Sequence, residues 1–140
     1  MDRVQVCEDW IDFLETQKWT QFATFTTKKP ITLKSARRLM AKVAVRVLRR
    51  DEKLFWAAEK FELGREGYHL HALITTRHSA NQIEKWYSEK YGRCVVSRYN
   101  PKRGAAAYVA KYLLKRSYDY DMLIGKGETE LFEVEGKARQ

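Results

Sequence analysis

Residues 66–74, with the sequence EGYHLHALI, constrain the fold of this chain more than any other stretch. A glycine before an alternating polar and apolar run is typical of a half-buried β-strand that follows a turn. Successive side chains on a strand point to opposite faces, so His69 and His71 share one face and the intervening residues face a core. Two adjacent imidazoles on a rigid strand can hold a metal ion, although such a pair is also common on an ordinary surface.

A second extended run, at residues 53–61, contains a third candidate ligand. The two glycines within residues 63–67 predict a hairpin turn between the runs. An antiparallel hairpin closed near the middle of that turn places Glu59 across from the two histidines and on their face. Glu62 is the competing carboxylate, but it falls in the turn and has the wrong alternation. The hairpin therefore predicts a site of two histidines and one glutamate, whose ligand types do not by themselves exclude Zn²⁺.

The charge of the chain favours a polyanionic partner. Its 140 residues suffice for one domain with a core, and its net charge is +9 with a pI near 9.6. Such a balance fits nucleic acid, although basic proteins without such a partner exist. Cys7 and Cys94 match no metal or disulfide pattern, so we expect packing residues in a reducing compartment. No apolar run approaches membrane-spanning length, which favours a soluble, cytoplasmic protein without a membrane partner.

Periodicity predicts the elements around the hairpin. We expect helices at residues 4–16, 33–49, 80–91 and 100–116, with Thr32 and Ser79 capping the second and third, and strands at residues 19–27 and 93–99. His78, just before the second cap, is expected in a loop and not among the ligands. The basic face of the second helix fits either solvent or a phosphate backbone. Residues 119–121 and 125–127 are expected to be loop, and residues 130–134 an edge strand or a partner-binding segment.

After the first helix, this order is β-α-β-β-α-β. It predicts an α+β fold with an antiparallel sheet of the ferredoxin-like (RRM-like) split βαβ type, flanked by helices and followed by a C-terminal catalytic helix. We expect a single domain over residues 1–140, with an N-terminal helix at 1–18, a core at 19–116 and a tail at 117–140. The histidine strand would lie mid-sheet, which is a firm place to hold a metal.

The last predicted helix has a stripe of two tyrosines and two lysines, namely Tyr108, Lys111, Tyr112 and Lys115. In isolation this stripe fits a solvated helix face. Beside a metal ion, it offers two nucleophilic hydroxyls and two cations. A tyrosine oxygen can attack phosphorus to form a covalent phosphotyrosine, while a divalent metal polarises a phosphate oxygen. The lysines can hold the phosphate or ease the loss of the tyrosine proton.

Together these motifs resemble those of the HUH endonucleases, the family of rolling-circle replication initiators, relaxases and certain transposases. His69-Leu70-His71 is similar to the HUH motif. Residues 108–112, YVAKY, look like the two-tyrosine motif of initiators from small single-stranded DNA phages. Residues 22–26, FATFT, resemble the first motif of the family, a strand with a structural and DNA-contacting role. The motifs follow the order of the family and lie within residues 19–116.

The resemblance implies an acidic third ligand, in agreement with Glu59, and Mg²⁺ or Mn²⁺ as the working ion. It implies a site-specific nickase and ligase of single-stranded DNA that initiates rolling-circle-type replication of a virus, phage or plasmid. Tyr108 is the first choice of nucleophile. Tyr112 is a second nucleophile or a structural residue, because residues 112–115 match the same tyrosine-lysine spacing.

The implied partners are single-stranded DNA at a replication origin, with or without a hairpin, and a host helicase and polymerase. We expect no helicase domain here, and a homodimer is left open. Four aromatic residues are candidates for base contacts, although they also fit a core, namely Trp19, Phe25, Trp56 and Tyr99. Two rival functions are a single-tyrosine HUH transposase and a non-catalytic nucleic-acid-binding module.

Overall fold

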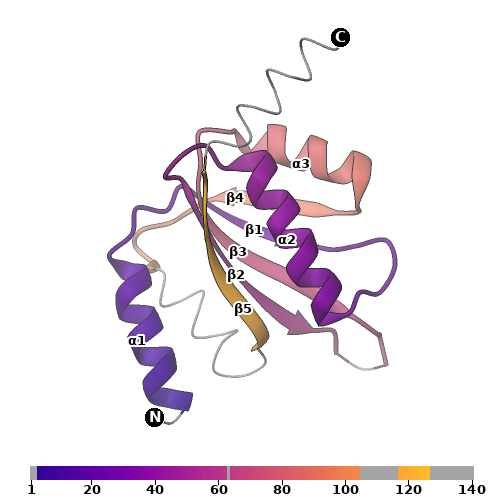
Figure 1. The fold of residues 1–140 in the computed structure, drawn as a ribbon, viewed down its shortest axis with the longest axis horizontal. Helices are drawn as coiled ribbons and strands as arrows, with labels where there is room; N and C mark the ends of the chain where they lie inside the picture. The colour runs from indigo at the N-terminus through magenta and orange to yellow at the C-terminus, as the bar shows by residue number, and fades with distance from the viewer. Residues whose placement is uncertain (1–2, 63, 105–116, 127–140) are drawn as a thin grey trace.

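The computed structural model describes residues 3–62, 64–104 and 117–126 of the chain (Figure 1). These residues form one sheet, with the strand order β4-β1-β3-β2-β5 and antiparallel pairing between all neighbours. The elements, in chain order, are α1 (Arg3–Glu15), β1 (Gln21–Phe25), α2 (Leu33–Val47), β2 (Lys53–Lys60), β3 (Tyr68–Thr75), α3 (Ala80–Lys90), β4 (Cys94–Arg98) and β5 (Ser117–Ile124).

The described part of the chain is an α+β fold with an open antiparallel sheet. Its two units, β1–α2–β2 and β3–α3–β4, are compatible with a ferredoxin-like split βαβ arrangement. The histidine strand β3 lies at the centre of the sheet, as predicted. It is held by five paired residues of β1 and eight of β2.

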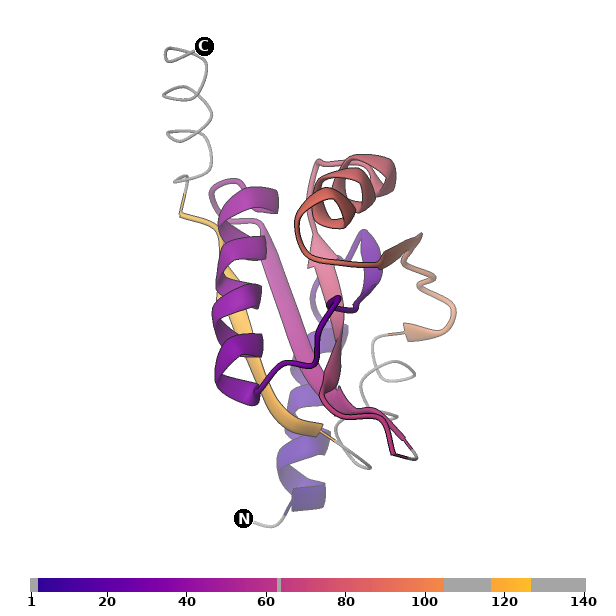
Figure 2. The same cartoon turned by 90° about the vertical axis from the view of Figure 1, so that its right-hand side faces the viewer.

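Helices α2 and α3 cover one face of the sheet (Figure 1). Both begin where their caps predict, because Thr32 Oγ1 accepts a hydrogen bond from the Ser35 amide and Ser79 forms a capping box with Gln82. The α2 stripe is buried against the strands, and Figure 2 shows α2 running alongside β5. Residues buried on this face include Ala36, Leu39, Met40, Val43, Ala44, Val47, Leu54, Trp56, Ala58, Leu70, Ala72, Ile74, Ile83 and Tyr87.

Helix α1 packs on the opposite face, a position that its sequence does not reveal. Leu14 of α1 is fully buried in a second cluster with Phe55 and Leu73. Trp19 closes the end of this helix, since its indole Nε1 donates a hydrogen bond to the Leu14 carbonyl at 2.9 Å. The face that carries the histidines is therefore partly covered.

The expectation of a loop at residues 119–121 is wrong, because they lie within β5, where Tyr120 and Asp121 pair with β2. Side-chain contacts on both faces of the sheet hold this edge strand in place. Arg37 of α2 binds the Asp119 carboxylate through two nitrogens, at 2.7 and 3.1 Å, and the Asp121 carboxylate at 2.8 Å. On the other face, Tyr120 packs edge-on against Trp10 of α1. The edge strand expected at residues 130–134 lies outside the described residues.

The helix expected from residue 100 does not start there, because residues 101–103 form a turn. The Asn100 side-chain oxygen accepts a hydrogen bond from the Lys102 amide, and the Asn100 main-chain carbonyl accepts one from the Arg103 amide. The rest of this predicted helix, residues 105–116, lies outside the described residues. Within residues 3–62, 64–104 and 117–126, we find no helix with the length and apolar character needed to cross a membrane.

Candidate metal centre

The β2–β3 hairpin positions the three predicted ligands. Glu59 pairs directly with His69, and His71 pairs with Ala57, two residues away from Glu59 on the same face. Glycines close the turn between the strands, and Gly67 has a φ of +92°. A side chain there would also meet Pro30, because a Cβ at this position would lie 2.9 Å from the Pro30 Cα. The hairpin geometry predicted from the sequence is confirmed.

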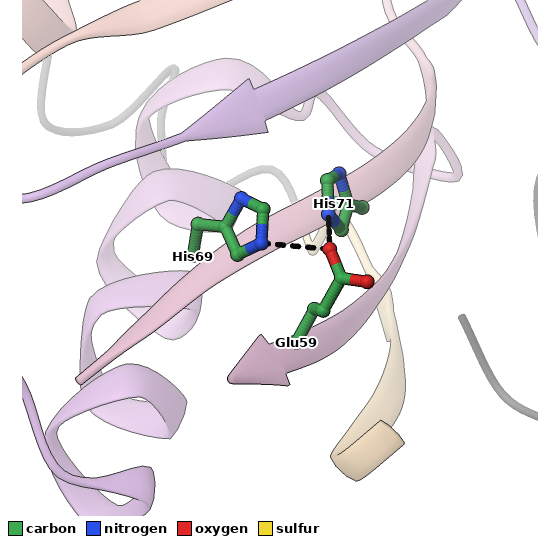
Figure 3. A group of neighbouring side chains, drawn as sticks. All are labelled: Glu59, His69 and His71. Carbon is green, nitrogen blue, oxygen red and sulfur yellow. Dashed lines mark hydrogen bonds and ion pairs between the residues drawn. The ribbon is translucent and has the colours of Figure 1, made fainter. Parts of the chain in front are cut away.

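The three side chains converge on one point (Figure 3). Glu59 Oε1 lies 2.7 Å from His69 Nε2 and 3.0 Å from His71 Nε2. One ligand atom from each residue falls within 4.8 Å of the other two. The side chains of His71, Glu59 and His69 are 7%, 18% and 24% exposed, respectively. The group is therefore largely enclosed, with His69 as its most open member.

Two imidazole nitrogens and one carboxylate oxygen form a donor set that suits a divalent cation. The two nitrogens already point at one oxygen, so the site needs little rearrangement to surround an ion. The described residues thus contain a candidate metal site whose ion is not assigned by the donors alone.

His71 is fixed from two further directions. Its Nδ1 lies 3.1 Å from Thr24 Oγ1 on β1, which is its direct pairing partner in the sheet. Its ring is parallel to that of Phe22, with centroids 6.1 Å apart. These contacts define the orientation of the imidazole plane before any ion binds.

His69 is held differently, by an aromatic stack at the rim of the site. The Phe61 ring lies nearly parallel to the imidazole, with centroids 4.8 Å apart, and the Arg65 guanidinium lies 3.9 Å from the centre of the Phe61 ring. Burial lowers the pKa of His69 and outweighs the opposing attraction of Glu59, while the positive charge of Arg65 lowers it further. The neutral imidazole is favoured, which is the form that binds metals.

The edge strand β5 begins beside the site. Glu59 pairs with Ser117, whereas Ala57 pairs with Tyr120, so the β2–β5 register shifts by one residue next to the glutamate. Such irregularities often re-aim side chains beside functional sites. Residues 105–116, which carry Tyr108, Lys111, Tyr112 and Lys115, lie outside the described residues.

Three of the four aromatic candidates for base contacts are core residues. Trp19 is 7% exposed within the α1-side cluster, and Phe25 and Trp56 are fully buried under α2 and α3. Tyr99 is partly buried against the α1-side cluster. His78 is a loop residue, as predicted, with Nδ1 3.1 Å from the Val47 carbonyl.

Sequence reasoning missed Thr24, Phe61 and Arg65 as neighbours of the ligands. Phe61 and Arg65 carried a usable signal, because both fall in the predicted hairpin. Thr24 carried none, since the β1–β3 register is not set by a short turn. Comparison of the chain with protein-family models, curated proteins and solved structures finds no match.

Proposed function

We propose that this protein is a metal-dependent, site-specific nickase and ligase of single-stranded DNA that initiates rolling-circle-type replication of a virus, phage or plasmid. The convergence of Glu59, His69 and His71 on the central hairpin carries the proposal. The same triad was inferred from the alternation of two strands and from the motif resemblance, which are separate lines of reasoning.

Glu59, His69 and His71 would hold Mg²⁺ or Mn²⁺, which supplies charge neutralisation at a non-bridging oxygen of the scissile phosphate. The Tyr108 oxygen attacks phosphorus, a Tyr–O–P bond forms, and the bond to the 3′ oxygen breaks. Lys111 assists loss of the tyrosine proton, and the departing 3′ oxygen takes a proton from water. The product is a 5′-phosphotyrosine and a free 3′-hydroxyl that serves as a primer. Attack of a 3′-hydroxyl on the same phosphorus breaks the Tyr–O–P bond, returns a proton to the tyrosine oxygen and rejoins the strand.

Tyr112 and Lys115 repeat the same tyrosine-lysine spacing one helical turn later in the predicted helix. In the proposed reaction, Tyr112 serves as a second nucleophile that accepts the strand in an alternate transfer. Lys115 holds the phosphate in that step, by charge attraction.

The return of the chain to the sheet is compatible with bringing a tyrosine to the triad. The described structure resumes at Ser117, opposite Glu59 in the sheet. Tyr112 precedes Ser117 by five residues, and an extended chain spans at most about 3.6 Å per residue. The length of the chain between them therefore allows Tyr112 to reach the candidate metal site.

Covalent capture tests the proposal. The full chain is incubated with a labelled library of single-stranded oligonucleotides and Mn²⁺, and the products are run on a denaturing gel. We expect a protein–DNA adduct that EDTA abolishes, that Tyr108→Phe loses, and that mass spectrometry maps to Tyr108. Tyr112→Phe is the matched variant and is assayed on the same library, which contains the cognate origin.

Other outcomes distinguish the rivals. DNA binding without an adduct, across a library that contains the cognate origin, contradicts the nickase and favours a binding module. An adduct coupled to excision and insertion at terminal repeats favours a transposase.

A further inference from the structure

A threonine on the neighbouring strand completes the environment of His71. Thr24 sits inside β1, paired with His71 on one side and with Val95 of β4 on the other. Its Oγ1 lies 3.1 Å from His71 Nδ1. On the opposite edge of the same ring, Nε2 lies 3.0 Å from the Glu59 carboxylate. The imidazole is therefore held at both nitrogens.

The protonation of the ring must differ between the free and the metal-bound site. A carboxylate can only accept hydrogen bonds, so in the free site Nε2 carries the proton that it donates to Glu59. A metal ion needs the lone pair of Nε2, and the neutral ring then carries its proton on Nδ1. In the neutral ring, Nδ1 therefore accepts a hydrogen bond when Nε2 carries the proton, and donates one when Nε2 binds a metal.

A hydroxyl group serves both states, because it donates or accepts by rotating about its C–O bond. We propose that Thr24 is a positioning residue that holds the His71 ring and accepts a hydrogen bond from Nδ1–H when Nε2 binds the metal. This inference rests on the metal site of the proposed function and adds a residue that acts through His71.

The burial of His71 makes the loss of this hydrogen bond costly. The side chain is only 7% exposed, against 24% for His69, so its Nδ1 has little access to water. A buried N–H that lost its acceptor would carry a desolvation cost. Outer-shell partners of metal-binding histidines typically contribute about 10- to 100-fold to metal affinity. The more exposed His69 has an aromatic stack with Phe61 at the corresponding place.

Two variants of Thr24 separate the hydroxyl from the shape of the side chain. Thr24→Val keeps the β-branched form that suits a strand and removes the hydroxyl, whereas Thr24→Ser keeps the hydroxyl. Thr75→Val is a matched control on the same strand face as the histidines, where the hydroxyl bonds the Lys18 carbonyl at 2.8 Å instead of a histidine. Thr24→Ala serves in place of Thr24→Val if the latter does not fold, as judged by thermal unfolding without metal.

The test titrates Mn²⁺ alone into each protein by calorimetry, and records the imidazole nitrogens by NMR without metal and with diamagnetic Zn²⁺. We expect Thr24→Val to weaken Mn²⁺ binding by about 10- to 100-fold, while Thr24→Ser and Thr75→Val stay close to the wild type. The NMR spectra should show the proton of His71 on Nε2 in the free protein and on Nδ1 with Zn²⁺.

Mn²⁺ affinity of Thr24→Val equal to that of the wild type, or equal losses in Thr24→Val and Thr24→Ser, would overturn the inference and leave the proposed nickase standing. If the wild-type protein bound no Mn²⁺, or if His71→Ala bound Mn²⁺ with the affinity of the wild type, the metal site itself would be contradicted. Both proposals would then fail.

Discussion

The two faces of the sheet are built from the same strands, yet they differ in chemistry. The face under α2 and α3 is filled by hydrophobic side chains such as Leu70 and Trp56, both fully buried. The face under α1 has a smaller hydrophobic cluster that includes Phe55 and Leu73, and the glutamate and histidines lie farther along the same strands. Alternate residues of β2 and β3 thus form the main hydrophobic core on one face and the polar site on the other. Substitutions at neighbouring positions should separate the two properties.

Removing a metal ligand should have the largest effect on the polar face. His71→Ala removes one of two nitrogen donors, so Mn²⁺ affinity should fall by more than the roughly 100-fold upper range for outer-shell residues. The covalent DNA adduct should disappear with it. Calorimetry with Mn²⁺ and the denaturing gel assay measure both losses.

The unfolding of His71→Ala in urea is the control for this substitution. A variant that binds Mn²⁺ normally while remaining folded would show that the three side chains do not hold the ion.

The neighbouring residue should show the reverse effect. Leu70→Ala leaves a cavity in the face under α2 and α3, and such substitutions cost about 2–5 kcal/mol of unfolding free energy. Urea denaturation measures the loss. The fraction that remains folded should keep its Mn²⁺ affinity, because the Leu70 side chain points away from the histidines.

Ala72→Gly offers a milder control on the same face of β3. A selective loss of Mn²⁺ binding in Leu70→Ala, without a loss of stability, would contradict the division between the faces.

A smaller effect is expected where α2 holds the edge strand β5. Arg37 binds Asp119 and Asp121, but the Arg37 side chain is 49% exposed and the two carboxylates are 26% and 43% exposed. Exposed ion pairs contribute about 0.2–1 kcal/mol each. Arg37→Gln should therefore lower the unfolding free energy by roughly 1 kcal/mol or less, with faster amide hydrogen exchange in β5.

Lys34→Gln, on the same helix, is the matched control for the change in charge. If exchange in β5 were identical in wild type and Arg37→Gln, backbone pairing and side-chain packing would hold the strand without the Arg37 ion pairs.

The parts of the structure that could be predicted are those set by local patterns. Thr32 and Ser79 mark helix starts through their own side chains, and a short glycine turn fixes the register that brings Glu59 to His69. Contacts between distant segments carry no such local signal. The pairing of Thr24 with His71 and the docking of α1 depend on packing that no spacing in the sequence encodes.

The strand β5 illustrates the same limit from the other side. Asp119 and Asp121 read as loop residues, because aspartate disfavours strands. Their carboxylates instead bind Arg37, which lies more than eighty positions earlier in the chain. A distant cation can thus turn a poor strand former into a strand residue.

The smallest effect concerns His69, at the open rim of the polar face. Burial lowers its pKa below the ordinary value of 6.5, against the pull of Glu59. Between the folded and the ordinary pKa, the unfolded chain binds more protons than the folded one. Stability of the metal-free protein should therefore fall as the pH drops from 6.5 toward the folded pKa, and this contribution should be constant above 6.5.

NMR titration of the His69 ring protons measures the pKa directly. Arg65→Gln should raise the pKa of His69, because it removes a nearby positive charge. Lys60→Gln removes an exposed charge from the same hairpin without a described contact to the Phe61 ring, and it should raise the pKa less. A wild-type pKa above 6.5 would mean that attraction to Glu59 outweighs burial. His69 would then be charged near neutral pH, and a metal would have to displace a proton as well as a hydrogen bond.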